Sequence, residues 1–184
     1  MSIPSNVLTN ADLIAYWNLT RGDSKTVLTE KELYQCGVMV KLIDILPATG
    51  SNIYLTDAIA DQYYNGINYK SVPDFLDSSF ANYVEKNQIN NNGTSLKVSN
   101  VSQDYLSMAL RGLWNDAKVN IWMGIVNPAT GGILYAYRMF SGYIDYFSSD
   151  FNNTAGNTTN ETTVNLNSLW KKLDQTQRLL SSTS

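Results

Sequence analysis

Hydrophobic and polar residues alternate with a period of two along much of the chain, and this pattern is typical of β-strands that bury one face. Residues 95–101 follow the alternation most clearly, and a longer, mainly apolar run begins at Cys36. Asn-, Gly- and Pro-containing stretches separate these segments and predict turns. Strands are therefore expected at residues 36–46, 52–56, 95–101, 118–126, 133–147 and 162–166.

A β-hairpin is predicted at residues 62–70, where Asn65-Gly66 stands between two runs rich in aromatic residues. Asn and Gly both tolerate positive φ, so this pair favours a two-residue type I′ turn. The segment 133–147 is long for a single strand, and Gly142 within it is the expected position of a bulge or kink.

Helical signals are few and short. Thr9 or Asn10 is a suitable N-cap, and Leu13, Ile14 and Trp17 after it fall on one helical face. Two further short helices are expected, one at residues 103–110 and one from Leu169 onward, capped by Ser168. Residues 150–160 are rich in Asn and Thr and show no periodicity, so a loop is expected there.

These elements predict a mainly β fold (β+α) with one or two short helices and extended terminal arms. Three ranges follow from the pattern: an N-terminal arm with a short helix at 1–34, a β domain at 35–168, and a C-terminal helix and polar tail at 169–184. At 184 residues, the chain is long enough to bury a core without disulfides or metals.

Charge and composition narrow the classes of partner. Charged residues make up 16% of the chain, which is below the usual fraction, and aromatic residues make up 11%. The net charge is −3 and no dense basic cluster occurs, so nucleic-acid binding is not expected. The N-terminus has no secretory signal pattern, and no apolar stretch is long enough to span a membrane. Such a surface suits persistent polar contacts between proteins.

The residues present give little support for catalysis or metal binding. The chain has no His and a single Cys, which excludes Ser-His-Asp and Cys-His nucleophiles and any CxxC zinc site. No phosphate-binding glycine loop is present. We therefore expect no enzyme activity, no cofactor and no metal. The carboxylates that a hydrolase could use are expected to cap turns at strand ends: Asp57, Asp61, Asp74, Asp145 and Asp150.

Other conspicuous residues are also expected to be structural. Arg21-Gly22-Asp23 matches an adhesion tripeptide but is interpreted as an ordinary glycine turn. Cys36 is expected to be a small buried residue at the start of a strand, and Trp114 and Trp122 are expected to pack in the core. Contacts with neighbouring subunits are instead predicted for residues near the two ends of the chain: Trp17, Trp170, Arg178, Leu179 and Leu180.

The order of several short motifs adds a family resemblance. A strand ending in Tyr54-Leu55-Thr56-Asp57 precedes the Tyr64-to-Tyr69 hairpin, and then come Leu96-Lys97-Val98-Ser99-Asn100, Ala117-to-Ile121 and Phe140-to-Asp145. In this order and spacing the motifs resemble the tail-tip and baseplate hub proteins of tailed bacteriophages, a family that includes the N-terminal part of phage lambda minor tail protein L. The resemblance covers residues 36–147.

The resemblance implies a hub-type β-barrel or split barrel that assembles into a three-fold or six-fold ring below the tail tube. The ring would join the tube to the central tip or to fibre-bearing proteins. The protein would be made in the host cytoplasm and located in the virion. Lambda protein L continues into a cysteine-rich region that holds a metal cluster; this chain has only Cys36, so no cluster is implied.

Two other functions stay open from the residues alone. The Tyr, Trp and Asn content also suits a β-sandwich that binds polysaccharide, as part of a surface or receptor-binding protein. A pair of carboxylates could in principle hydrolyse a glycan or an ester, as in glycosidases.

Overall fold

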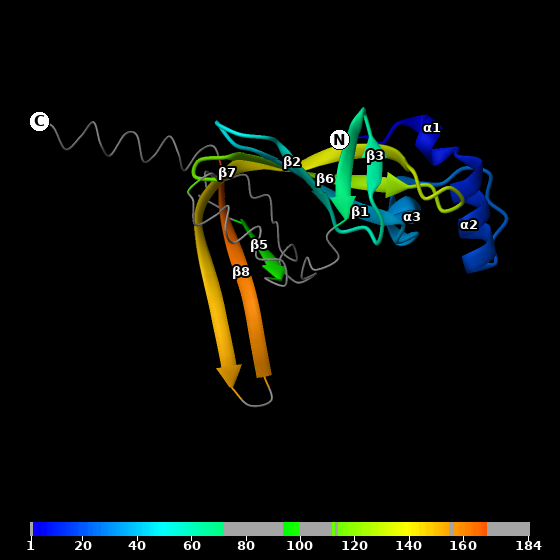
Figure 1. Cartoon of the computed structure of the whole chain (residues 1–184). Coiled ribbons are helices and arrows are strands. Elements are labelled where there is room, and N and C mark those ends of the chain that lie inside the picture. The colour runs from blue at the N-terminus through cyan, green and yellow to red at the C-terminus, as the bar shows by residue number, and fades with distance from the viewer. Residues whose placement is uncertain (1, 72–93, 100–111, 113, 155–156, 169–184) are drawn as a thin grey trace, which may run out of the picture. The chain divides into compact units, whose positions relative to one another are not determined.

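The protein is mainly β, as the computed structural model in Figure 1 shows. The structure describes residues 2–71, 94–99, 112, 114–154 and 157–168. Its helices are α1 (Ser5–Leu8), α2 (Ala11–Arg21) and α3 (Glu30–Gln35). Its strands are β1 (Met39–Leu46), β2 (Ile53–Thr56), β3 (Gln62–Tyr64), β4 (Ile67–Ser71), β5 (Thr94–Ser99), β6 (Lys118–Val126), β7 (Ile133–Thr154) and β8 (Asn157–Ser168).

The eight strands are hydrogen-bonded in the order β3-β4-β2-β1-β6-β7-β8-β5. Strand β2 pairs with β4 in parallel, whereas β3–β4, β7–β8 and β5–β8 are antiparallel. The order begins at β3 and ends at β5 without a ladder that joins these two strands, so the described sheet is open. The prediction of a mainly β fold is confirmed, and the closed-barrel form of that prediction is wrong.

The chain divides into two compact units, which are described separately here. Unit 1 consists of residues 1–43, 54–71 and 122–139, and unit 2 consists of residues 44–53, 72–121 and 140–184. The predicted ranges 1–34, 35–168 and 169–184 stay a prediction.

In unit 1 the N-terminal helices bury an apolar core of their own. Leu13 and Leu33 are fully buried, and Ile125 of β6 packs in the same cluster. Helix α2 begins at the Asn10 cap, whose side chain accepts hydrogen bonds from the backbone N–H groups of Asp12 and Leu13. The prediction of a helix capped at this position is confirmed. The apolar residues of this part of the chain pack against residues of β6 and β7.

A second apolar cluster in unit 1 lies under the β3–β4 hairpin. Leu42, Tyr69 and Ala136 form its buried centre. The hydroxyl of Tyr64, on β3, accepts a hydrogen bond of 3.1 Å from the backbone N–H of Ala136 on β7. Because β3 and β7 are not neighbours in the strand order, this contact shows that the sheet curls until its end strand approaches β7.

The type I′ hairpin predicted at Asn65-Gly66 is confirmed. Both residues have positive φ, 48° at Asn65 and 80° at Gly66, and Tyr64 pairs with Ile67 across the turn. A two-residue turn with left-handed residues matches the right-handed twist of the two strands. The local sequence therefore predicts the type of this turn.

Unit 2 is built around the pairing of β7, β8 and β5. Trp114 is 4% exposed, and its ring lies 5.7 Å from that of Phe147 on β7, which confirms the predicted packing role of this tryptophan. A Cβ atom at Gly142 would lie 2.2 Å from the backbone oxygen of Asn167. Glycine is therefore required here for close approach of β8. The register shift occurs between Ile144 and Tyr146, so the prediction of a bulge at Gly142 is wrong by a few residues.

Two further expectations about local structure are corrected. Residues 150–160 were expected to form a loop, but β7 continues to Thr154 and β8 begins at Asn157. The sequence of this segment is rich in Asn and Thr and shows no alternation of apolar and polar residues. The usual sequence signal of a strand is therefore missing, although β7 and β8 pair here. Cys36 was expected to open a strand, but it is the C-cap of α3. The helices predicted at 103–110 and from Leu169 lie outside the described residues.

Candidate interaction surfaces

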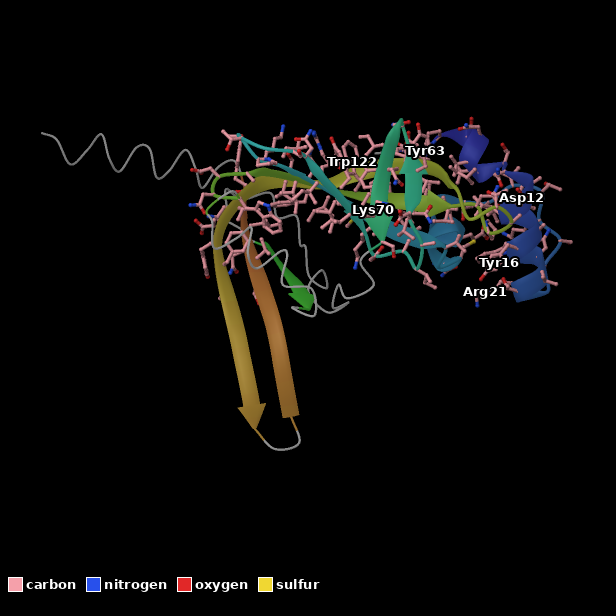
Figure 2. All side chains as sticks on the ribbon, in the orientation of Figure 1. Asp12, Tyr16, Arg21, Tyr63, Lys70 and Trp122 are labelled. Carbon is pink, nitrogen blue, oxygen red and sulfur yellow. The ribbon has the colours of Figure 1, made fainter. Side chains whose placement is uncertain are left out.

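The β3–β4 hairpin presents an exposed face on unit 1. Tyr63 is 69% exposed, and Ile59, just before the hairpin, is 98% exposed. Figure 2 shows Tyr63 and Lys70 on this hairpin. An aromatic ring and an aliphatic side chain of this exposure are typical of protein contacts. The hairpin is therefore one candidate interaction surface of unit 1.

Asp61 fixes the base of this hairpin. Its carboxylate accepts a hydrogen bond of 2.6 Å from Lys70 Nζ and another of 2.9 Å from the backbone N–H of Ser71. These bonds stabilise the charged form, so the pKa of Asp61 is lowered from its ordinary value, with the bond from Lys70 as the main cause. Ser71 Oγ in turn donates to the carbonyl of Ala58 at 2.6 Å. The geometry gives Asp61 the turn-stabilising role that the sequence predicts.

The other candidate carboxylates are similarly placed or fall outside the described part. Asp57 accepts a hydrogen bond of 2.6 Å from the backbone N–H of Lys41, and Lys41 Nζ lies 3.9 Å from the same carboxylate. Asp145 is exposed on β7. Asp150 lies on β7 opposite Glu161 of β8. Asp74 lies outside the described residues.

Trp122 is half-buried in the second apolar cluster of unit 1. The guanidinium of Arg138 lies over its ring, 5.9 Å from the centroid. This cation–π contact covers part of the ring face that a sugar would need. The position of Trp122 therefore agrees with the predicted packing role and offers little to a glycan.

The helical side of unit 1 is held by polar contacts between distant parts of the sequence. Asn127 is 6% exposed, and its Nδ2 donates to the carboxylate of Asp12 on α2 at 2.7 Å. Its Oδ1 also accepts from the backbone N–H groups of Ala129 and Thr130 in the β6–β7 turn. One buried amide thus joins helix α2 to this turn.

Helix α3 begins with a capping box. Thr29 and Glu32 exchange hydrogen bonds between side chain and backbone. Glu32 also pairs with Lys25, and mainly for this reason its pKa is lowered to about 2. The Thr29-to-Glu32 spacing is a known helix-start signal. The sequence interpretation missed it, although the signal was present in the residues.

The Arg21-Gly22-Asp23 tripeptide is engaged within its own unit. Gly22 ends α2 in the left-handed conformation with φ 65°. Arg21 donates to the carbonyl of Gln35 at 3.1 Å and lies over the ring of Trp17, while Asp23 accepts from Trp17 Nε1 at 3.3 Å. The interpretation as an ordinary glycine turn is confirmed.

The five predicted contact residues are not brought together in the described structure. Trp17 is 7% exposed, and its indole packs among the N-terminal helices. The predicted contact of Trp17 with a neighbouring subunit stays a prediction, and its ring has a packing role within its own chain. The other four lie outside the described residues: Trp170, Arg178, Leu179 and Leu180.

Cys36 is a free, buried thiol, as the sequence predicts in this respect. Burial raises the pKa of the Cys36 thiol and keeps it in the unreactive, protonated form. Burial also raises the pKa of Tyr137, and a hydrogen bond with Tyr34 contributes. Neither group is prepared for nucleophilic chemistry at neutral pH.

In unit 2 a hydrogen-bonded polar trio, Asp44, Asn120 and Ser141, crosses three adjacent strands. Asn120 Nδ2 donates to the carboxylate of Asp44 at 3.3 Å, and Ser141 Oγ donates to Asn120 Oδ1 at 2.9 Å. Asp44 and Asn120 are 6% and 7% exposed. Paired polar groups of this kind fix strand register, because any slip leaves a buried group unsatisfied. The trio holds β1, β6 and β7 together.

Strands β7 and β8 form a ribbon that exceeds its neighbour in length. Strand β5 pairs with β8 from Glu161 to Leu166, whereas among the described strands Asn157–Asn160 pair only with Phe151–Thr154 of β7. Figure 1 shows the ribbon as a long pair of arrows that continue past β5. No expectation from the sequence pointed to this feature.

The part of the chain that the structure describes shows neither a metal site nor a membrane helix. It contains no group of three or more His, Cys, Asp or Glu side chains that could hold a metal ion. None of its described helices has the length and hydropathy of a membrane-spanning segment.

The fold is similar to that of one chain in a solved particle, described as "Virion of native gene transfer agent (GTA) particle". The TM-score is 0.55 and the sequences are 21% identical. The similarity covers 78% of this chain but only 45% of that chain, so this protein spans less than half of the length of its structural neighbour. No protein-family model matches the sequence. No curated protein matches it either.

Proposed function

We propose that this protein is a structural component of a phage-like virion. The observation that carries the proposal is the similarity in fold, over 78% of the chain, to a chain of the gene transfer agent particle. The ordered β motifs of residues 36–147 support it independently, because they resemble hub proteins of tailed phages.

Within the virion, we propose a position in the tail tip or baseplate hub. There the protein forms a three-fold or six-fold ring and joins the tail tube to the central tip or to fibre-bearing proteins. Two features support this finer assignment: the resemblance in sequence to the N-terminal part of lambda minor tail protein L, and two exposed hydrophobic residues, Tyr63 on the β3–β4 hairpin and Ile59 just before it. The protein is made in the host cytoplasm and incorporated as the tail assembles.

The proposed role involves no catalytic step. Asp57 and Asp61 are occupied by hydrogen bonds to backbone and lysine groups. The polysaccharide-binding alternative has weaker support, because Trp114 is buried and Arg138 covers part of the Trp122 ring.

The test is the composition of purified particles. Particles from the producing host should contain this chain when analysed by mass spectrometry after density-gradient purification. Antibodies against the chain should label the tail tip in immunogold electron microscopy, with particles from a deletion strain as the control. Absence of the chain from intact particles would refute the virion role, and label along the tube or head would refute only the tail-tip position.

A further inference from the structure

The turn of the β3–β4 hairpin exposes a side chain that can react with its own backbone. Asn65 and Gly66 are both exposed, and the Asn65 amide has no hydrogen-bond partner among the described residues. Apart from the chain neighbours of Gly66, nothing lies within 4 Å of a Cβ atom placed on it. The backbone nitrogen of Gly66 is therefore open to approach by the Asn65 side chain.

The reaction available to this pair is the formation of a cyclic imide. The Gly66 nitrogen gives up its proton to solvent and attacks Cγ of Asn65. A bond forms between these two atoms, the Cγ–Nδ2 bond breaks, and the departing nitrogen takes up a proton and leaves as ammonia. Water then opens the ring at one of its two carbonyls. Cleavage of the new bond gives aspartate, and cleavage of the original peptide bond gives isoaspartate.

The geometry of the turn decides whether the hairpin must open for this reaction. The φ of Asn65 is 48°, near the value of about +60° that a type II′ turn requires at the same position. The two turn types differ by a flip of the peptide plane between their central residues, which takes ψ of the first to about −120° in type II′. This flip brings the Gly66 nitrogen to the Cβ side of Asn65, and it reverses the sign of φ at Gly66, which glycine allows. Both turn types fit a two-residue hairpin, so the strands can stay paired while the ring closes.

We propose that Asn65 is a modification site, which converts through a cyclic imide to aspartate and isoaspartate while the β3–β4 hairpin stays folded. Water is the only co-reactant. Aspartate followed by glycine favours the same type I′ turn, so this product keeps the hairpin and adds a negative charge at its tip. Isoaspartate adds one carbon atom to the backbone of the loop. Because loop length fixes the register of a hairpin, this second product changes the presentation of the exposed Tyr63.

The first experiment follows Asn65 in the intact, folded chain. The protein is incubated above neutral pH, where the attacking nitrogen loses its proton more readily, and is then mapped by tandem mass spectrometry. Isoaspartyl methyltransferase labelling identifies the second product. Asn68 is the internal control, because it is exposed on the same hairpin but precedes Tyr69, whose side chain hinders the attack. Mapping also separates the other Asn-Gly pair, Asn92-Gly93, which lies outside the described residues.

A second experiment asks whether the hairpin must open. The folded chain should convert Asn65 at a rate within about tenfold of the rate in denaturant, since local unfolding adds no large free-energy cost to the reaction. Tyr64→Phe removes the hydroxyl that accepts the hydrogen bond from Ala136 and loosens the attachment of the hairpin. This variant should convert at the wild-type rate. Asn65→Gln would need a larger ring and should not convert, which identifies the mass change with this residue.

Three results would overturn the inference: conversion of Asn65 no faster than that of Asn68, a folded chain that converts more than about tenfold more slowly than the unfolded chain, or faster conversion in Tyr64→Phe. The last two results would show that the reaction needs an open hairpin. All measurements use the free chain, and the inference does not rest on the proposed virion role. Failure of either one therefore leaves the other intact.

Discussion

The helical side of unit 1 and the β7–β8 ribbon of unit 2 are stabilised in different ways. The helices are short, and they are held by fully buried Leu13, Leu28 and Leu33 and by the Asp12–Asn127 hydrogen bond. The far part of the ribbon is long and rich in Asn and Thr, and backbone pairing between two strands holds it. The stability of the helices therefore comes from side chains buried in a core. The far part of the ribbon is held by hydrogen bonds between its two strands.

The comparison indicates that the packed helices contribute more to the stability of a single copy than the far part of the ribbon does. Short helices are unstable alone and form because tertiary packing supports them. The sequence of residues 151–160 is rich in Asn and Thr, so we expect this far part of the ribbon to add little to the stability of an isolated copy. We expect substitutions in the two regions to have effects of very different size.

The largest effect is expected for Leu33→Ala. Its side chain is fully buried, and truncation in a packed core costs about 2–5 kcal/mol. Chemical denaturation monitored by tryptophan fluorescence would measure this loss. In the same assay, removal of residues 151–160 should lower the free energy of unfolding of the monomer by less than about 1 kcal/mol, since a two-stranded ribbon is marginal alone. Comparable losses would show that the ribbon is part of the core.

The next largest loss of stability is expected for Gly142→Ala. The new Cβ would meet the backbone oxygen of Asn167 at 2.2 Å, so β7 and β8 must separate, at a cost of about 1–3 kcal/mol. The midpoint of thermal unfolding would report the loss. Gly132→Ala is the matched control, because its nearest neighbour lies at 3.6 Å. Equal effects of the two substitutions would contradict the close-approach explanation.

A smaller effect is expected at the start of α3. Thr29→Ala removes the side-chain half of the capping box and should cost about 1 kcal/mol. Thr29→Ser keeps the hydroxyl and should retain most of the stability. Denaturant titrations of the wild type and the two variants would measure the free energy of unfolding. An equal loss of stability in the serine variant would show that the methyl group of Thr29, and not the cap, is responsible.

The smallest effect is a pH dependence at Glu32. Its pKa in the folded protein is about 2, below the ordinary value of 4.5, so the folded state favours the charged carboxylate. The stabilisation is present above pH 4.5 and decreases as the pH falls toward 2. Thermal unfolding midpoints of the wild type should approach those of Glu32→Gln as the pH is lowered through this window. A constant difference between the two proteins would contradict the prediction.

Local signals explain which elements could be predicted from the sequence. The Asn65-Gly66 turn, the Asn10 cap and the span of β6 follow from residues that are close in the chain. The capping box at Thr29 was also a local signal but was not used. Residues 150–160 could not be assigned to strands, because Asn and Thr do not show which face is buried and pairing alone determines their conformation.

The candidate surfaces were less predictable than the fold. Exposure of Tyr63 and Ile59 depends on how the hairpin packs on β7 through Tyr64, a contact across 72 positions of sequence. The contact predicted for Trp17 stays a prediction, and its indole lies in an apolar cluster that also contains Ile125, a residue far along the chain. Sequence position says little about exposure when the burying partner lies far along the chain.

The hydrogen bond between Asp12 and Asn127 also has a consequence for synthesis. The two residues are 115 positions apart. Ribosomes add about 5–20 residues per second, so Asn127 is synthesised roughly 6–23 s after Asp12. During this interval Leu13, Leu33 and the residues around them lack the β6–β7 surface that buries them. The nascent chain therefore exposes the apolar residues of its N-terminal segment first, and chaperone binding to these residues during translation is the expected result.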